Sequence, residues 1–430
     1  MKVKSETTGI IQSLLQGIPL PRMVKVRQNF EAPVVQNLEQ TLRQEIAKES
    51  IAPQIKPGMR IAVAVGSRGL AELPALVRIT VDELQRRGAH PFIVPAMGSH
   101  GGATAQGQQA VLANLGVTEE TAGCPIISSM EVVEVGRLEN GLAVLIDKQA
   151  YEADGIVVIA RIKPHTAFRG ASESGLAKML TIGLGKQKGA DACHAYSFKY
   201  MARFIVDMAR IKLQQCNFLF GIATVENAYE QIRVVEAVPA EDFLKRDQEL
   251  LPLARTSMAK LILDKIDVLI VDKIGKDISG DGMDPNITGR YPTPYARGGP
   301  EISKLVVLDL TERTHGNANG MGPADFITRR LFDKIDYEST YANALTSTVC
   351  EPIRIPMILE SDQQAIAAAV KTCNAQDLSK VRVVRIEDTL HLGEIYISEA
   401  MISEAAQHQQ IEVCSAPLAL EFDQAGNLLI

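Results

Sequence analysis

Short apolar runs alternate with longer amphipathic segments along the first half of the chain, a pattern typical of buried β-strands separated by helices. Strands are predicted where apolar runs are bounded by turn residues, at 60–65, 91–95, 155–162 and 218–223. Helical periodicity predicts helices over 73–87 and 105–115. This alternation favours a mostly parallel sheet covered by helices, in which ligands bind at the carboxyl ends of the strands.

The second half of the chain continues the same pattern after a helix expected over 242–260, with a strand at 267–272. At 430 residues the chain is too long for one ordinary core. We therefore expect an α/β fold with two domains, each a mostly parallel sheet flanked by helices, and an active site in the cleft between them. The expected division is an N-terminal cofactor-binding and catalytic domain over 1–263, a C-terminal α/β domain over 264–410, and a tail hairpin over 411–430 that packs on either domain.

Polar, glycine-bearing loops directly follow three of the predicted strands. They read G-S-R-G at 66–69, M-G-S-H-G-G at 97–102 and K-P-H-T-A-F-R-G at 163–170. Loops that leave the same edge of a parallel sheet can converge, so Arg68, His100 and His165 are predicted neighbours. A histidine in an ordinary loop is usually only a hydrogen-bonding surface residue, but these two lie where a sheet presents catalytic side chains.

Lys178 and His194 complete a stretch of about thirty residues in which the sequence indicates chemistry. Lys178 lies in the apolar run L-A-K-M-L, and its residues leave two interpretations open. The side chain either extends from a helix to solvent, which is the commoner case, or is partly desolvated and serves as a nucleophile for a covalent cofactor link. Cys193 precedes His194, but a buried and inert thiol is the more frequent state of a free cysteine.

Composition narrows the function without identifying it. The net charge is −6, charged residues make up 22% of the chain, and no basic run is present, so nucleic acid is not expected as a partner. The start of the chain has no apolar core of signal-peptide length and no segment is long enough to span a membrane, so we expect a cytoplasmic protein. The six cysteines form no C-x-x-C pair, which excludes zinc ribbons and iron–sulfur runs.

The order and spacing of His100, His165, Lys178 and His194 resemble those of the nickel-dependent lactate racemases and related 2-hydroxyacid racemases and epimerases. The resemblance covers about a third of the chain, roughly 60–194. It implies a nickel-pincer nucleotide, a pyridinium mononucleotide with two sulfur-bearing arms, covalently linked to Lys178. His194 would then bind the nickel, and His100 and His165 would be the acid/base pair. The G-S-R-G loop would correspond to the family's anion-binding loop, which makes Ser67, Arg68 and Gly69 candidates for the cofactor phosphate and Arg68 a candidate for the substrate carboxylate.

The function implied by this resemblance is inversion of a small-molecule 2-hydroxy acid by reversible hydride transfer, with proteins of cofactor biosynthesis as partners. The sequence leaves the hydroxy acid and the oligomeric state open. The interval between His165 and Lys178 is longer than the family pattern and reads R-G-A-S-E-S-G at 169–175, which indicates a divergent branch. Two alternatives remain: a Schiff-base or pyridoxal-phosphate enzyme that uses Lys178, and a non-catalytic protein that binds a nucleotide or metallocofactor.

Two loops of the second half are further candidates for a substrate-facing wall. The first is D-I-S-G-D-G-M-D-P-N at 277–286, with Arg290, Tyr291 and Arg297 after it. The second is H-G-N-A-N-G-M-G-P-A-D-F at 315–326, which follows a predicted strand and is expected to lead into a helix. The competing interpretation of this second loop is a glycine-rich turn in which Gly322-Pro323 starts the next helix.

Overall fold

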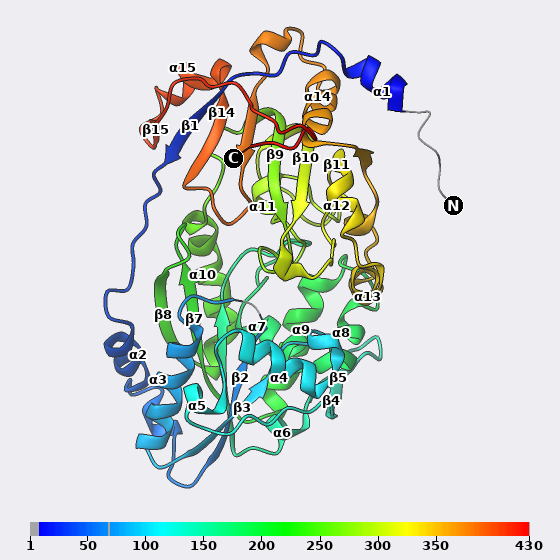
Figure 1. Ribbon diagram of the computed structural model, residues 1–430. Helices are drawn as coiled ribbons and strands as arrows, with labels where there is room; N and C mark the ends of the chain where they lie inside the picture. The colour runs from blue at the N-terminus through cyan, green and yellow to red at the C-terminus, as the bar shows by residue number, and fades with distance from the viewer. Residues whose placement is uncertain (1–7, 68, 430) are drawn as a thin grey trace. The chain divides into compact units, whose positions relative to one another are not determined.

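The computed structural model describes residues 8–67 and 69–429, which form two compact units. We call residues 31–258 and 346–348 the N-terminal unit, and residues 8–30, 259–345 and 349–429 the C-terminal unit. Each unit contains a large, mostly parallel sheet with helices against it, so the predicted α/β fold class is confirmed (Figure 1). Among the described residues, no helix has the length and apolar character that crossing a membrane requires.

The N-terminal unit is built on a five-stranded sheet in the order β3-β2-β6-β7-β8, in which only β8 is antiparallel to its neighbour. The strands are β2 (Arg60–Val65), β3 (His90–Pro95), β6 (Gly155–Arg161), β7 (Phe218–Glu226) and β8 (Ile232–Pro239). A separate hairpin consists of β4 (Val132–Arg137) and β5 (Ala143–Asp147). The four predicted strands of this half match β2, β3, β6 and β7, because their apolar runs are buried on both faces of the sheet.

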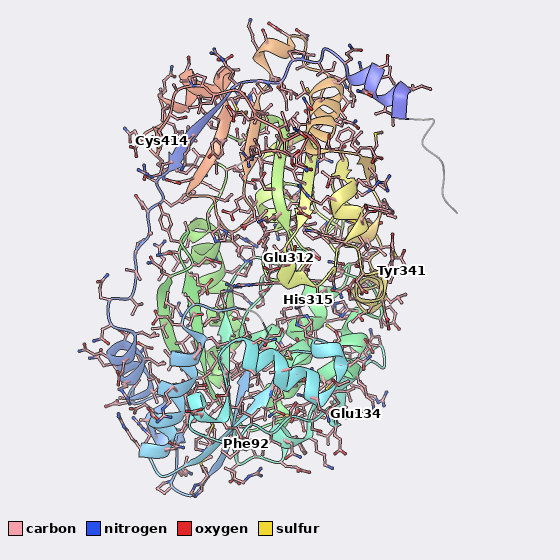
Figure 2. All side chains as sticks on the ribbon, in the orientation of Figure 1. Phe92, Glu134, Glu312, His315, Tyr341 and Cys414 are labelled. Carbon is pink, nitrogen blue, oxygen red and sulfur yellow. The ribbon has the colours of Figure 1, made fainter. Side chains whose placement is uncertain are left out.

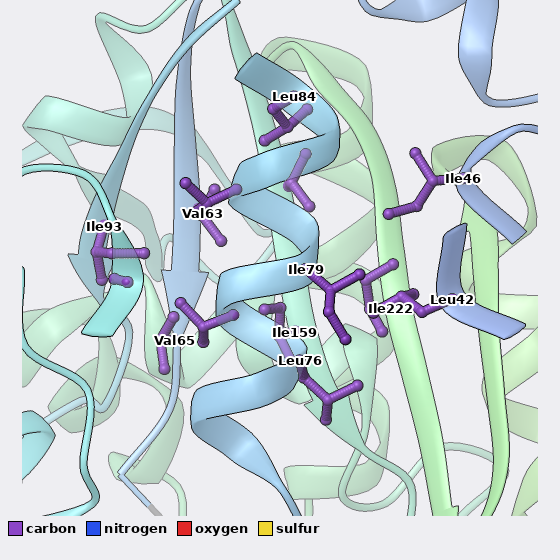
Figure 3. Close-up of a cluster of buried hydrophobic side chains, with 14 of the residues drawn as sticks. Leu42, Ile46, Val63, Val65, Leu76, Ile79, Leu84, Ile93, Ile159 and Ile222 are labelled. Atoms are coloured by element: carbon purple, nitrogen blue, oxygen red, sulfur yellow. The ribbon is translucent and has the colours of Figure 1, made fainter. Parts of the chain in front are cut away.

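Helices cover both faces of this sheet. They are α2 (Leu38–Ile46), α3 (Leu73–Arg86), α4 (Ala105–Asn114), α5 (Glu119–Ala122), α6 (Lys148–Tyr151), α7 (Leu176–Lys178), α8 (Lys186–His194), α9 (Met201–Gln215) and α10 (Phe243–Ser257). On one face, Leu76, Ile79 and Leu84 of α3 pack against Val63 and Ile222 of the sheet (Figure 3). On the other face, α7 contacts β6 and α10 contacts β7. The helices therefore pack their apolar sides on the sheet, and the polar groups lie in the loops that connect strands and helices.

The C-terminal unit has an eight-stranded sheet in the order β12-β11-β10-β9-β13-β14-β1-β15. Its strands are β1 (Met23–Gln28), β9 (Lys265–Ile274), β10 (Glu301–Leu310), β11 (Phe326–Thr328), β12 (Met357–Leu359), β13 (Val383–Ile386), β14 (Glu394–Ser398) and β15 (Ile411–Val413). The first five strands of that order are parallel, and the last three pair antiparallel. Its helices are α1 (Thr8–Leu15), α11 (Pro285–Thr288), α12 (Arg329–Asp333), α13 (Tyr337–Ser347, whose last two residues belong to the N-terminal unit), α14 (Asp362–Thr372) and α15 (Ile402–Ala405).

The division of the chain differs from the expected boundaries at 263 and 410. The first described residues, up to Phe30, belong to the C-terminal unit, because β1 pairs with β14 on one side and β15 on the other. Val24 and Val26 of β1 are fully buried in the core of that unit. The tail beyond Ile411 belongs to the same unit, and its end folds back through a bridge between Phe422 and Leu428. A strand whose partners lie more than 350 residues away gives no local signal of its domain.

Candidate functional site

The predicted site residues that the structure describes all lie in the N-terminal unit, after adjacent parallel strands. Because β3, β2 and β6 are neighbours and run parallel, the loops that follow them leave the same edge of the sheet. Ser67 and Gly69 follow β2, His100 follows β3, and His165 follows β6. Arg68, the candidate for cofactor phosphate and substrate carboxylate, lies outside the described residues.

His100 is exposed and hydrogen-bonded to its neighbour loop. Its Nδ1 and the hydroxyl of Ser67 form a hydrogen bond, which brings together two of the predicted residues. Its own loop is held by Gln108, whose side-chain amide donates to the carbonyl oxygens of Gly98 at 2.8 Å and of His100 at 3.2 Å. The buried ammonium of Lys186 in turn donates to Gln108 Oε1 at 3.1 Å. The loop is thus fixed by a buried polar network while the imidazole stays accessible.

His165 lies in a loop that closes on itself. Lys163 and Ser174 exchange backbone hydrogen bonds of 3.1 and 3.2 Å across the loop ends. Within it, the backbone N–H of Ala167 donates to His165 Nδ1 at 3.0 Å. Burial is the main factor that lowers the pKa of His165 well below its ordinary value, with further lowering by the charge of Lys178. His165 is therefore neutral near pH 7.

Lys178 ends the short helix α7 and is followed by a π-helical turn over Met179–Gly183. The carboxylate of Asp247 accepts hydrogen bonds of 2.9 Å from the N–H groups of Leu176 and Ala177, which begin this helix. At the other end, the buried Lys212 donates to the carbonyl oxygen of Leu180 at 2.5 Å. π-Helical turns are rare in proteins, and those that occur are often at functional sites. The half-buried Lys178 therefore lies next to an unusual backbone segment that is held by hydrogen bonds at both ends.

The two buried charges that support this helix have strongly shifted pKa values. Burial raises the pKa of Asp247 to about 6, against the opposing effect of its hydrogen bonds from Ala177 and Leu176. Burial lowers the pKa of Lys212 to about 7. Both groups therefore change charge close to neutral pH, on either side of the segment that carries Lys178.

His194 ends α8, and its ring is oriented by its own helix. His194 Nδ1 lies 2.7 Å from the carbonyl oxygen of Ala190, which can only accept, so Nδ1 carries a proton and Nε2 presents a lone pair in the neutral ring. Burial lowers the pKa of His194, which favours this neutral form. A backbone carbonyl is a common hydrogen-bond partner of a histidine whose other ring nitrogen binds a metal.

Aromatic rings connect His165 and His194. The centroid of Phe198 lies 5.4 Å from the ring of His194 and 6.0 Å from that of His165. Phe168 also packs against the His165 ring, with centroids 4.3 Å apart. The positive charge of Lys178 lowers the pKa of both histidines, so the three side chains are close enough to interact electrostatically. The loops after β2 and β3 reach the same region, since Gly66 lies against Met179 and the N–H of Gly98 donates to Gly183 at 3.1 Å.

No group of three or more His, Cys, Asp or Glu side chains with the geometry of a metal site occurs within 8–67 and 69–429. Cys193, next to His194, is fully buried, and burial raises the pKa of its thiol to about 12. The thiol is therefore protonated and offers neither a nucleophile nor a ready metal ligand. A metal at this site would need most of its ligands from a bound cofactor.

In the C-terminal unit the structure brings together the two glycine-rich loops that the sequence indicated. They follow β9 and β10, which are parallel neighbours, and Figure 2 labels His315, the first residue of the second loop. The hydroxyl of Thr311 donates to Asp277 at 2.6 Å, and Gly320 lies so close to the backbone of Asp281 that a Cβ would clash. The predicted helix start at Gly322-Pro323 is wrong. These residues form a turn into β11, and the next helix begins only at Arg329.

Three supporting residues were not predicted from the sequence: Glu173, Asp247 and Lys212. Glu173 accepts the backbone N–H of His165, and Lys212 donates to the carbonyl oxygen of Leu180, close to Lys178. Asp247 accepts the N–H groups at the start of α7, the helix that carries Lys178. For two of them a signal exists, because Asp247 and Lys212 occupy positions in the otherwise apolar stripes of α10 and α9. A charged residue at such a position is buried only when it has partners.

These features define an α/β protein with a lysine and three histidines grouped by loops at the carboxyl edge of a parallel sheet. Residues 12–203 match the family model described as the lactate racemase N-terminal domain, and this range contains the predicted cofactor-binding, metal-binding and acid/base residues. The matched range spans less than half of the 430 residues, and over this range the chain is similar to that domain.

The comparison with curated proteins found no match. Among solved structures, the chain is similar to the lactate racemase apoprotein from Thermoanaerobacterium thermosaccharolyticum, with 15% sequence identity and a TM-score of 0.48. The similarity covers 91% of this chain and 96% of that protein.

Proposed function

We propose that this chain racemises or epimerises a 2-hydroxy acid, with a nickel-pincer nucleotide linked to Lys178. The match of residues 12–203 to the lactate racemase N-terminal domain supports isomerase chemistry of the racemase or epimerase type. The cofactor, the acid/base histidines and the class of substrate are the finer parts of the proposal, and they rest on the geometry of the N-terminal unit.

The observation that carries the proposal is the orientation of His194. Its Nδ1–H is engaged by the carbonyl oxygen of Ala190, so Nε2 is the nitrogen with a free lone pair. Its neighbourhood contains Lys178 and His165, yet no protein-only metal cluster occurs among the described residues. A single oriented imidazole beside a half-buried lysine fits a metal whose other ligands belong to a lysine-linked cofactor, and nickel accepts imidazole and sulfur ligands.

His194 would thus be the protein ligand of nickel, and the Lys178 amine would be the point of covalent attachment. Bound in this way, the cofactor would supply a hydride acceptor for the substrate carbon. Ser67 and Gly69 lie in the loop after β2, where backbone N–H groups could hold its phosphate, and Arg68 is the proposed partner for phosphate or substrate carboxylate.

The chain's own residues handle the proton of the substrate hydroxyl. His100 and His165 are the proposed acid/base pair, since both imidazoles belong to loops at the same edge of the sheet. Phe168 and Phe198 pack around His165 and His194 and restrict water near the site. A 2-hydroxy acid meets these requirements because it has a carboxylate, an ionisable hydroxyl and a carbon that can lose hydride.

The test is to express the protein in a host that makes the cofactor and to measure its intact mass and nickel content. The chain should carry about one nickel and a mass increase of nucleotide size. Lys178→Ala should abolish the mass increase, and His194→Ala should lower the nickel content. Lys188→Ala is the matched control, because Lys188 is exposed on α8 and should leave both values unchanged.

An unmodified Lys178 without nickel in such a host would contradict the proposal. Borohydride trapping of a carbonyl compound on that lysine would then favour a Schiff-base enzyme. A bound cofactor in a protein whose function survives loss of either His100 or His165 would favour a carrier. Polarimetric or chiral chromatographic assay of a panel of 2-hydroxy acids identifies the substrate when the cofactor is present.

A further inference from the structure

Glu173 is a fully buried carboxylate at the centre of the His165 loop. Its Oε2 accepts the backbone N–H of His165 at 2.7 Å, and its Oε1 accepts that of Gly170 at 3.1 Å. Arg255 of α10 forms an ion pair with the same carboxylate, and Arg169 lies 3.4 Å from Oε2. One side chain therefore ties the start and the middle of the loop to a neighbouring helix.

The shape that these contacts impose determines what faces the ring of His165. With the His165 and Gly170 N–H groups drawn to Glu173, the chain turns so that the N–H of Ala167 points at His165 Nδ1, 3.0 Å away. A backbone N–H can only donate, so Nδ1 must be an acceptor. The proton of the neutral ring is then on Nε2.

His100 differs from His165 in the partner of its Nδ1. That partner is the hydroxyl of Ser67, which can donate or accept, so His100 can carry its proton on either nitrogen. The low pKa of His165, caused mainly by burial, keeps its ring neutral near pH 7. The two histidines are therefore prepared for different parts of a proton transfer.

We propose that Glu173 is a positioning residue that holds His165 as its Nε2–H tautomer, so that His165 donates a hydrogen bond to the substrate oxygen while His100 accepts the hydroxyl proton. The tautomer follows from the contacts alone. The assignment to substrate rests on the proposed function. The side chain of Glu173 bonds the backbone of His165 and not its ring. A positioning role for Glu173 therefore requires that its loss changes the tautomer of the His165 ring.

The experiment is long-range ¹H–¹⁵N spectroscopy of the full-length protein labelled with [¹⁵N]histidine, with the His165 signals assigned by their loss in His165→Gln. In the wild-type protein, His165 Nδ1 should resonate as an unprotonated nitrogen and Nε2 as a protonated one. Glu173→Gln removes the charge and one acceptor, and should shift His165 toward a mixture of tautomers. Glu236→Gln is the matched control, because Glu236 also pairs with an arginine of α10, Arg246, and should leave His165 unchanged.

A protonated Nδ1 in the wild-type protein, or identical His165 signals in Glu173→Gln, would overturn the proposal. If Glu173→Gln does not fold, Glu173→Asp replaces it, because the shorter side chain keeps the charge but cannot reach both N–H groups. These spectra need no cofactor, so they decide the tautomer even if the proposed function fails.

The kinetic part applies once racemisation is observed. Glu173→Gln should lower kcat about tenfold or more with little change in KM, because it misplaces a group that acts in the transition state. His165→Gln places an amide N–H near the position of Nε2, whereas His165→Asn places one near Nδ1. His165→Gln should therefore retain about tenfold more activity than His165→Asn. The reverse order would contradict a donor role for Nε2.

Discussion

The ammonium group of Lys212 lies 2.5 Å from the carbonyl oxygen of Leu180, two residues beyond Lys178. Lys212 comes from α9, where it continues an apolar stripe that includes Met208 and Ala209. Its hydrogen bond reaches a backbone acceptor inside the π-helical turn. The segment that carries Lys178 is thus supported through a buried amine whose pKa is lowered by burial to about 7.

This contact predicts a pH dependence of stability. In the unfolded chain Lys212 keeps its ordinary pKa of 10.5, so above pH 7 the unfolded state binds more protons than the folded state. The free energy of unfolding should therefore rise with pH between 7 and 8.5, by at most about 1.4 kcal/mol per pH unit from this group. Guanidinium unfolding of wild-type and Lys212→Met proteins across this range measures the effect.

The unfolding free energy of the wild-type protein minus that of Lys212→Met should increase as the pH rises. Lys56→Met, a change at an exposed lysine, serves as the control and should give a curve parallel to that of the wild-type protein. Parallel curves for the Lys212 variant would mean that Lys212 does not titrate in this range.

Local pattern was sufficient for four of the five strands of the N-terminal sheet, β8 being the one it missed, and for the loops that follow β2, β3 and β6. The run R-I-A-V-A-V predicts β2 correctly, because a strand covered on both faces must be apolar throughout. The same reasoning could not assign β1, whose partners β14 and β15 lie at the far end of the chain. It also missed β11, a strand of three residues that is too short for periodicity to detect.

The candidate site shows the same limit. The order of strands brings Ser67 to His100, and this proximity could be anticipated from parallel strands alone. The roles of Glu173 and Asp247 depend on which backbone N–H groups their carboxylates reach across 8 and 71 positions of the chain. Long-range contacts of this kind follow from the packing of helices and loops, which no local pattern specifies.

Gly107 of α4 should be essential for the loop that presents His100. A Cβ at Gly107 would lie 1.8 Å from the carbonyl oxygen of Gly101, the residue after His100. Gly107→Ala should therefore destabilise the protein by about 1–3 kcal/mol or more and disturb the hydrogen bond between His100 and Ser67. Chemical denaturation and the NMR signals of His100 would report both effects.

Gly69→Ala makes an informative comparison with Gly107→Ala. A Cβ at Gly69 has no described atom within 4 Å, so its effect on stability should stay within about 0.5 kcal/mol. If Gly69 helps to bind the cofactor phosphate, this variant should instead show weaker cofactor retention in the loaded protein. A large loss of stability in Gly69→Ala would show that the loop after β2 is packed more tightly than its surroundings indicate.

Cys193 should be inert despite its position beside His194. The thiol is buried, its pKa is raised to about 12, and its sulfur lies 3.3 Å from that of Met201. Alkylation of the native protein at pH 8 should modify the exposed Cys350 and Cys414 and leave Cys193 unmodified, as peptide mass mapping can establish. Cys193→Ala should keep the proposed racemase activity within a few-fold, and a complete loss of that activity with an intact fold would assign the thiol a direct role.

The ion pair between Asp272 and Arg385 should be critical for the C-terminal unit. The guanidinium of Arg385 on β13 contacts the carboxylate of Asp272 on the adjacent β9 through bonds of 2.8–3.1 Å; Arg385 is buried and Asp272 is largely buried. Burial raises the pKa of Asp272 even with this partner present. Arg385→Met leaves a buried carboxylate without its cation and should cost about 3–5 kcal/mol near pH 8.

The cost of Arg385→Met should shrink on acidification. Without the arginine, the pKa of Asp272 in the folded variant rises further above its unfolded value of 3.8, so protonation in the folded state relieves the penalty as the pH falls toward 4. Asp272→Asn in the Arg385→Met background should recover much of the lost stability at pH 8, because the uncompensated charge is gone. Arg22→Met, which breaks an exposed pair with Glu399, should change the unfolding free energy by only about 0–1 kcal/mol. Equal effects of the two arginine variants would mean that the buried pair is solvated in the folded protein.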